Sequence, residues 1–150
     1  MSREAFGRPG LSPAWSRASK QGVGTSMSDR SKVWFTIAGG VVTEVYYPTV
    51  DTANTRDIRF LVTDSTFFDT EGKDTTAEVE YIEAKAPAYR VTNTAKSGAY
   101  VITKKILTAP DSHSLVMNVR FEALKGDSKD YRLFILFAQK KKNRGFENSG

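Results

Sequence analysis

Acidic side chains are the groups in this sequence best suited to bond-breaking chemistry, because glycoside hydrolysis needs two carboxylates that flank the scissile bond. The candidates lie between residues 44 and 69 and are Glu44, Asp51, Asp57, Asp64 and Asp69. Asp64 and Asp69 stand in stretches typical of turns, where short acidic side chains bond to nearby backbone amides. Asp57 follows Arg56, and a cationic neighbour favours an ionised carboxylate, which does not suit a general acid. No pair of carboxylates therefore predicts an active site within this chain.

Two short motifs bring other chemical groups together. Asp111-Ser112-His113 holds the three residue types of a catalytic triad. Triad members meet through the fold, however, and adjacent residues do not orient on one another correctly, so a turn after Pro110 is the better interpretation. The stretch GVGT at residues 22–25 lacks the flanking strand and helix of a phosphate loop, and no Gly-Lys-Ser/Thr follows it. Neither motif predicts a catalytic residue or a bound nucleotide.

Composition excludes several classes of site. The chain has 150 residues, no cysteine and a single histidine, His113. Disulfide scaffolds, thiolate zinc sites, cysteine nucleophiles and multi-histidine metal sites are excluded, and no metal or cofactor is predicted. No apolar run reaches the ~20 residues of a membrane span, so no membrane partner is expected. The N-terminus has no apolar signal-peptide core, which predicts a cytoplasmic location if Met1 is the native start.

Positive charge collects near the end of the sequence. The formal net charge is +5, and Lys140, Lys141, Lys142 and Arg144 supply four of the 22 basic residues. No aromatic residue stands between these charges to stack on bases. Residues 139–150 are therefore predicted to be a solvated basic tail, and nucleic acid is not predicted as a partner.

The elements that must position any site are β-strands, because a period of two dominates the hydrophobic pattern. Strands are expected at residues 33–37, 41–47, 58–63, 66–68, 79–84, 89–94, 100–107, 114–122 and 132–137. Gly39-Gly40 between the first two predicts a hairpin, since a type I′ turn needs positive φ at both central positions. Strands of this length and spacing predict an all-β sandwich or barrel over residues 32–138, after an irregular lead-in over residues 1–31.

The last strand, residues 133–138, is apolar on both faces. Such a strand needs cover on both sides, so it lies either inside a two-layer core or beside a continuation of the chain. An uncovered edge and apolar face favour association, which makes a homodimer through this edge a further expectation.

Six motifs occur in a fixed order along the first half of the chain. They are AFGRPGLSPAW at residues 5–15, GVGT at 22–25, SKVWFT at 31–36, EVYYPTVD at 44–51, TRD at 55–57 and FLVTD at 60–64. The ordered set, above all EVYYP followed by TRD, resembles the N-terminal domain of prokaryotic glucoamylases and glucodextranases, glycoside hydrolase family 15. The resemblance spans residues 5–137.

This resemblance implies a large antiparallel β-sandwich, the supersandwich of galactose-mutarotase-like domains. It implies as a partner an (α/α)6 barrel of the same polypeptide, whose glutamates hydrolyse α-glucosidic bonds with inversion. Those glutamates belong to the barrel, so no catalytic residue is expected in this chain. The family's domain is longer, and this chain corresponds to about its first half. The sequence departs from the family pattern after Ala138, where Gln139-Lys140 replaces a Pro-His pair.

The same resemblance directs attention to the loop that runs from Tyr46 to Asp57. We expect it to contact the barrel or the rim of the substrate cleft, because its tyrosines are amphipathic and its charged groups can hydrogen-bond across an interface. The residues concerned are Tyr46, Tyr47, Asp51, Arg56 and Asp57. In the alternative interpretation these side chains only lock the loop internally. A second alternative, for the whole chain, is a free-standing module that binds α-glucans through flat aromatic side chains.

Overall fold

The computed structural model describes residues 19–83 and 87–140. This part contains strands and one short 3-10 helix, η1 (Ser128–Asp130). The strands are β1 (Gly22–Thr25), β2 (Trp34–Ala38), β3 (Val41–Tyr46), β4 (Ala53–Thr63), β5 (Phe68–Thr70), β6 (Thr75–Glu83), β7 (Ala88–Ala95), β8 (Tyr100–Thr108), β9 (Leu115–Ala123) and β10 (Arg132–Gln139).

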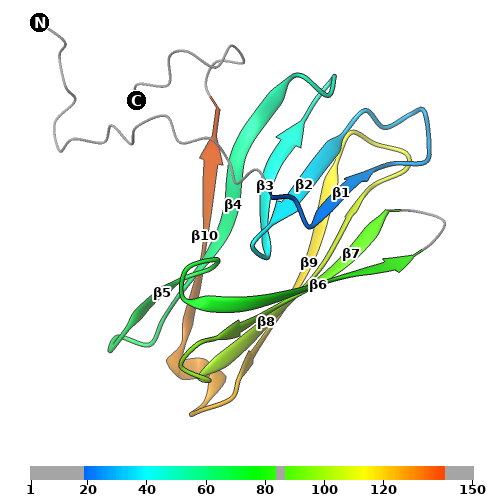
Figure 1. Cartoon of the computed structure of the whole chain (residues 1–150). Helices are drawn as coiled ribbons and strands as arrows, with labels where there is room; N and C mark the ends of the chain where they lie inside the picture. Colours follow the sequence, from blue (N-terminus) through cyan, green and yellow to red (C-terminus); the bar gives the residue numbers. More distant parts are fainter. Residues whose placement is uncertain (1–18, 84–86, 141–150) are drawn as a thin grey trace, which may run out of the picture.

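The strands form two antiparallel sheets that lie one against the other (Figure 1). Sheet A has the order β1-β2-β3-β4-β10, and β5 pairs with the far end of β4. Sheet B has the order β6-β7-β8-β9. This confirms the predicted all-β antiparallel sandwich and decides against a barrel.

Sequence pattern explains most strands directly. Gly39 and Gly40 adopt φ of +60° and +71°, and the Ala38–Val41 pair closes the predicted two-residue hairpin around them. Both positions favour glycine because a Cβ is strained at positive φ. Strand β9 alternates half-buried and exposed residues along its whole length, as its period of two predicts.

Sheet A extends further than the sequence pattern predicts. Strand β4 begins at Ala53 rather than Ile58, because residues 53–57 pair with both β3 and β10. Strand β1 lies inside the expected lead-in and pairs with β2. A Cβ at Gly24 would overlap the ring of Phe35, so this glycine serves close packing and not phosphate binding. The division of the chain at residue 32 remains a prediction.

The core fills the space between the two sheets in two clusters. One joins Phe35, Ile37 and Val42 of sheet A to Val91 and Ile106 of sheet B. The other cluster packs Phe60 and Val62 of β4 against residues of β7, β8 and the turn between them, which are Ala95, Ala99, Tyr100 and Ile102. Aromatic contacts of Tyr100 with Phe67, Phe121 and Tyr131 extend this second cluster. Side chains that alternate along every central strand thus supply both walls of the core.

One flank of the sandwich is open among the described residues. Strands β9 and β10 end their respective sheets and are joined through η1. The large apolar side chains of β10 are exposed, from 38% at Leu133 to 64% at Ile135. The inward side chains of β9 are only half-buried. The last strand was expected either inside a two-layer core or beside a continuation of the chain. Its position at the edge of sheet A rules out the first of these interpretations.

Candidate functional site

The five residues expected to form a site are brought into one hairpin at an end of sheet A. Tyr46 is the last residue of β3, Tyr47 and Asp51 belong to the connection, and Arg56 and Asp57 lie in the first half of β4. Alternation places Tyr46 and Asp57 on the outward face of sheet A, because their neighbours Val45 and Ile58 pack against the core. The structure therefore brings the five residues into one hairpin, but their side chains do not all face the same place.

Tyr46 belongs to a polar cluster on the outward face. Its hydroxyl hydrogen-bonds to the Glu44 carboxylate. Glu44 Oε2 also accepts hydrogen bonds from Lys20 Nζ at 2.7 Å and from Thr36 Oγ1 at 3.2 Å. Burial, the hydrogen bond to Glu44 and that carboxylate's charge raise the pKa of Tyr46 to about 12. Trp34 is directly opposite Tyr46 in the β2–β3 register. This cluster combines two aromatic rings with a carboxylate that is already engaged by a cation.

Tyr47 joins the hairpin to a distant loop. Its ring lies 4.9 Å, centroid to centroid, from the ring of His113 in the β8–β9 connection. His113 Nδ1 in turn accepts a hydrogen bond of 3.1 Å from the Lys32 backbone N–H. Tyr47 remains 39% exposed. No local sequence signal indicates this contact, because His113 is distant in the chain and its surroundings predict only a turn.

The connection that carries Asp51 is held by its own hydrogen bonds. Thr49 Oγ1 donates to the Asp51 carboxylate, and this bond lowers the pKa of Asp51. Tyr47 N–H donates to Thr52 C=O at 3.1 Å, and Asn54 Nδ2 donates to Tyr47 C=O at 2.7 Å. Asp51 itself is exposed. The loop therefore has a defined shape before any partner contacts it.

Asp57 is held by two arginines. Arg59 Nη2 lies 2.9 Å from its Oδ2, and Arg56 Nε lies 3.4 Å from the same atom. The Arg56–Asp57 pair is expected from their adjacency. The closer Arg59 was missed, although residues two apart on a strand share a face and this spacing was a usable signal. Asp57 is buried, so the arrangement fixes the start of β4.

The triad residue types do not act together. Asp111 pairs with Arg30 at 3.4 Å, Ser112 Oγ donates to Ser114 Oγ at 3.1 Å, and His113 contacts Lys32 and Tyr47. Asp64 accepts hydrogen bonds from Thr66 as a turn residue, as predicted, whereas Asp69 lies in strand β5 and accepts a hydrogen bond of 3.1 Å from the Tyr100 hydroxyl. In the described part of the chain, no three His, Asp or Glu side chains are grouped to hold a metal ion.

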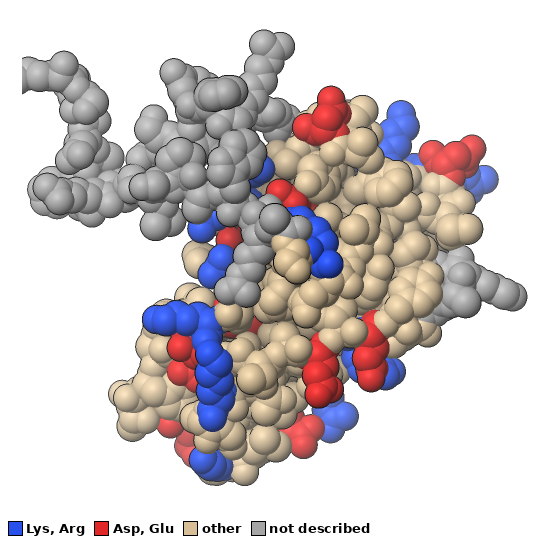
Figure 2. All heavy atoms as spheres, in the orientation of Figure 1, with Lys and Arg blue, Asp and Glu red and all other residues tan. Residues whose placement is uncertain are grey.

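Charge is mixed over the face of the molecule that Figure 2 shows. Figure 2 shows acidic and basic side chains interspersed on the face in view, with no broad basic patch among the coloured residues. Two residues of the expected basic tail are in the described part: Gln139 ends β10, and the Lys140 N–H donates to Asn54 C=O at 2.9 Å. Residues 1–18 and 141–150, with most of that tail, lie outside the described residues. Within residues 19–83 and 87–140, no helix combines the length and apolar character of a membrane crossing.

Comparison with known proteins identifies the family. The family model described as glucodextranase, domain N, matches residues 5–150. A glucoamylase of Clostridium sp. (strain G0005) is 46% identical over 147 residues, which is 97% of this chain and 21% of that protein. A crystal structure of a bacterial glucoamylase in complex with acarbose superposes with a TM-score of 0.83 at 46% identity. The similarity covers 87% of this chain and 20% of that one, so the chain spans about a fifth of these relatives. The chain belongs to the glucodextranase domain N family.

Proposed function

We propose that this chain is a non-catalytic β-sandwich part of a glucoamylase-type α-glucan hydrolase. Its role is to support an (α/α)6 catalytic barrel and to shape one rim of the substrate cleft. Membership of the domain N family and the similarity to two glucoamylases support this parent class. The chain contributes a scaffold and no bond-breaking group.

The observation that carries the proposal is a difference between the outward faces of the two sheets. The outward face of sheet B is mainly polar, with cross-strand rows such as Glu78, Thr92, Thr103 and Arg120, or Glu80, Arg90, Lys105 and Asn118. The outward face of sheet A is amphipathic and carries Trp34, Tyr46, Arg59, Leu61, Phe134 and Leu136. A polar ladder suits water, whereas apolar groups beside fixed charges suit a protein partner.

The loop expected from Tyr46 to Asp57 is a β3–β4 hairpin whose connection is residues 47–52, and it borders this face of sheet A. Its internal hydrogen bonds support a contact role, because a preorganised loop loses little conformational entropy on binding. Internal locking and contact with the barrel are therefore compatible roles for the same five residues. Tyr47 offers a partly exposed ring at the start of the β3–β4 connection.

The state of the carboxylates supports the absence of catalysis. Glu44 and Asp57 each contact a cationic side chain, and Asp111 is paired with Arg30. Two carboxylates that face each other across a substrate-sized space are the requirement for glycoside hydrolysis. The engaged pairs of this chain do not provide that arrangement.

The test uses the purified chain with maltooligosaccharides, and a Clostridium glucoamylase serves as the positive control. We expect no glucose release and no saturable heat in calorimetric titration. Glucose release that survives repurification would overturn the scaffold role. Saturable binding without glucose release would instead support the α-glucan-binding module.

A further inference from the structure

Strand β4 changes its partner along one edge. Strand β3 pairs with it at Val42–Ile58, and β5 takes over at Leu61–Thr70. Phe60 lies between these two ladders. Its C=O accepts a 3.0 Å hydrogen bond from Glu71 N–H, and its N–H donates to Glu71 Oε2 at 3.0 Å. Glu71 thus satisfies both backbone groups at the break in the ladder.

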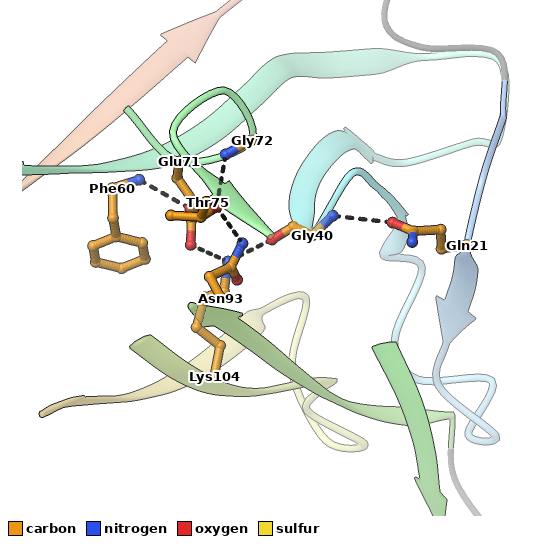
Figure 3. Close-up of polar contacts among 8 residues, drawn as sticks. All are labelled: Gln21, Gly40, Phe60, Glu71, Gly72, Thr75, Asn93 and Lys104. Carbon is orange, nitrogen blue, oxygen red and sulfur yellow. Dashed lines mark hydrogen bonds and ion pairs between the residues drawn. The ribbon is translucent and has the colours of Figure 1, made fainter. Parts of the chain in front are cut away.

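Lys104 reaches this break from the opposite sheet. It occupies an inward position of β8, between Ile102 and Ile106, which belong to the core. Its Nζ donates to Glu71 Oε1 at 2.5 Å and to Gly40 C=O at 2.7 Å (Figure 3). The Lys104 and Glu71 side chains are 1% and 0% exposed. The salt bridges Lys20–Glu44, Arg56–Asp57 and Arg59–Asp57 of sheet A, and Arg90–Glu80 of sheet B, all keep more exposed surface.

The surroundings hold both ends of the pair in place. Gly40 N–H donates to Gln21 Oε1 at 3.0 Å (Figure 3). Thr75 Oγ1 accepts from Gly72 N–H and from Asn93 Nδ2, each at 3.3 Å. A Cβ at Gly40 would lie 2.6 Å from Asn93 Nδ2, so sheet B closes directly over the hairpin.

Stability alone does not account for a charge pair in this position. Burial raises the pKa of the Glu71 carboxyl and lowers that of the Lys104 ammonium, and their mutual attraction offsets this only in part. Replacement of buried ion pairs by apolar groups of similar volume is often neutral or stabilising. Apolar contacts between sheets have no direction, whereas Lys104 must meet one carbonyl and one carboxylate. The pair therefore discriminates between alignments that an apolar core would tolerate.

We propose that Lys104 and Glu71 form an inter-sheet latch that selects one alignment of sheet B on sheet A. The latch is a conformational device of the fold and is independent of the scaffold role proposed above. Lys104 links the β2–β3 hairpin and the β5–β6 turn to the central strand β8. Loss of the latch should permit several alignments of similar free energy.

The test compares the wild-type chain with Lys104→Met, Glu71→Gln and the double variant. Lys104→Met leaves a buried carboxylate without its cation and should lower the urea midpoint strongly. The double variant removes both charges, while the amide introduced by Glu71→Gln can still accept from Phe60 N–H, so its midpoint should recover. We expect its amide exchange protection in β7 and β8 to fall at least tenfold, with doubled NMR cross-peaks around Gly40 and Phe60.

The matched control is the exposed cross-strand pair Arg90–Glu80, which lies on the outward face of sheet B at 3.1 Å. Arg90→Met with Glu80→Gln should leave exchange protection and cross-peak number unchanged. A double latch variant with a single set of cross-peaks and wild-type protection would overturn the proposal. A double variant that fails to fold would also overturn it, because the pair would then be required for stability itself.

Discussion

At the scale of single residues, the polar groups of this domain are mostly used to hold the fold. Tyr46, Glu44 and Lys20 form a chain of contacts on sheet A, and Asp57 is held by Arg59 and Arg56. Hydrogen bonds to charged groups are stronger than those between neutral groups. These clusters therefore fix the hairpin at the end of sheet A, on which the proposed contact with a barrel depends.

The Tyr46 cluster predicts an alkaline titration. Its folded-state pKa, about 12, lies above the ordinary value of 10.0. The stability that this group contributes is thus fully present below pH 10 and is lost as the pH rises through about 12. Tyrosinate absorbance can be followed against pH in the wild-type chain and in Tyr46→Phe. The difference between the two curves should have its midpoint near pH 12. A midpoint near 10 would show that neither burial nor Glu44 raises the pKa of Tyr46.

Gly40 provides a test of the hairpin and its contact with sheet B. Gly40→Ala combines a positive φ with overlap against Ala77 and Asn93, and should cost about 2–4 kcal/mol of unfolding free energy. Gly98 is the matched control, since its φ is +66° but the nearest atom to a Cβ there is 4.0 Å away. Gly98→Ala should cost about 1 kcal/mol. Equal losses in urea denaturation would contradict the close approach at Gly40.

Lys104 shows what sequence reasoning could and could not find. The inward phase of β8 reads Tyr100, Ile102, Lys104 and Ile106, so a lysine on the apolar phase was a visible anomaly. Its partner Glu71 could not be predicted, because it stands in a turn distant in the chain. The Tyr47–His113 contact was missed for the same reason. Local pairs such as Arg56 with Asp57 were predictable, and contacts between sheets or loops were not.

At the scale of elements, period-two alternation and turn residues predicted the type of nearly every strand. Strand β1 was missed because GVGT has two glycines and no alternation, and its position follows from packing on Phe35 and Tyr89. The start of β4 was missed because residues 54–57 are all polar. They nevertheless pair on both sides, and this pairing is not visible from their own composition.

Strand β10 predicts self-association of the isolated chain. In the described residues it pairs only with β4, and its side chains from Leu133 to Phe137 are uncovered. An unpaired apolar edge is a template for another strand. We expect a concentration-dependent dimer in sedimentation experiments, weakened by Ile135→Lys and unaffected by Val116→Lys on the outward face of β9. A wild-type chain that stays monomeric at high concentration would contradict this.

The outward face of sheet A predicts a stability effect in a longer protein. The matching fifth of the Clostridium glucoamylase can be exchanged for this chain. Phe134→Ser with Leu136→Ser should then lower the melting temperature of the chimera by several degrees, because we expect the remaining polypeptide to cover both side chains. Val116→Ser on sheet B is the control. Equal melting temperatures for all three chimeras would remove sheet A as the contact face.

At the scale of the whole molecule, the described structure is a sandwich with one side uncovered. Full burial of a large apolar side chain is worth about 1.5–3 kcal/mol, so the half-exposed residues of β10 leave on the order of 5 kcal/mol unrealised. A small domain has a total stability of only about 5–15 kcal/mol. A partner that covered this flank would therefore add substantially to the stability of the sandwich.

The most direct measurement of the scaffold role compares three forms of the Clostridium glucoamylase: the parent, a form without the fifth that matches this chain, and the chimera that carries this chain in its place. We expect the deleted form to lose soluble activity on maltooligosaccharides. The chimera should retain kcat/KM within about tenfold of the parent. A deleted form that keeps the parent's activity and melting temperature would contradict the account.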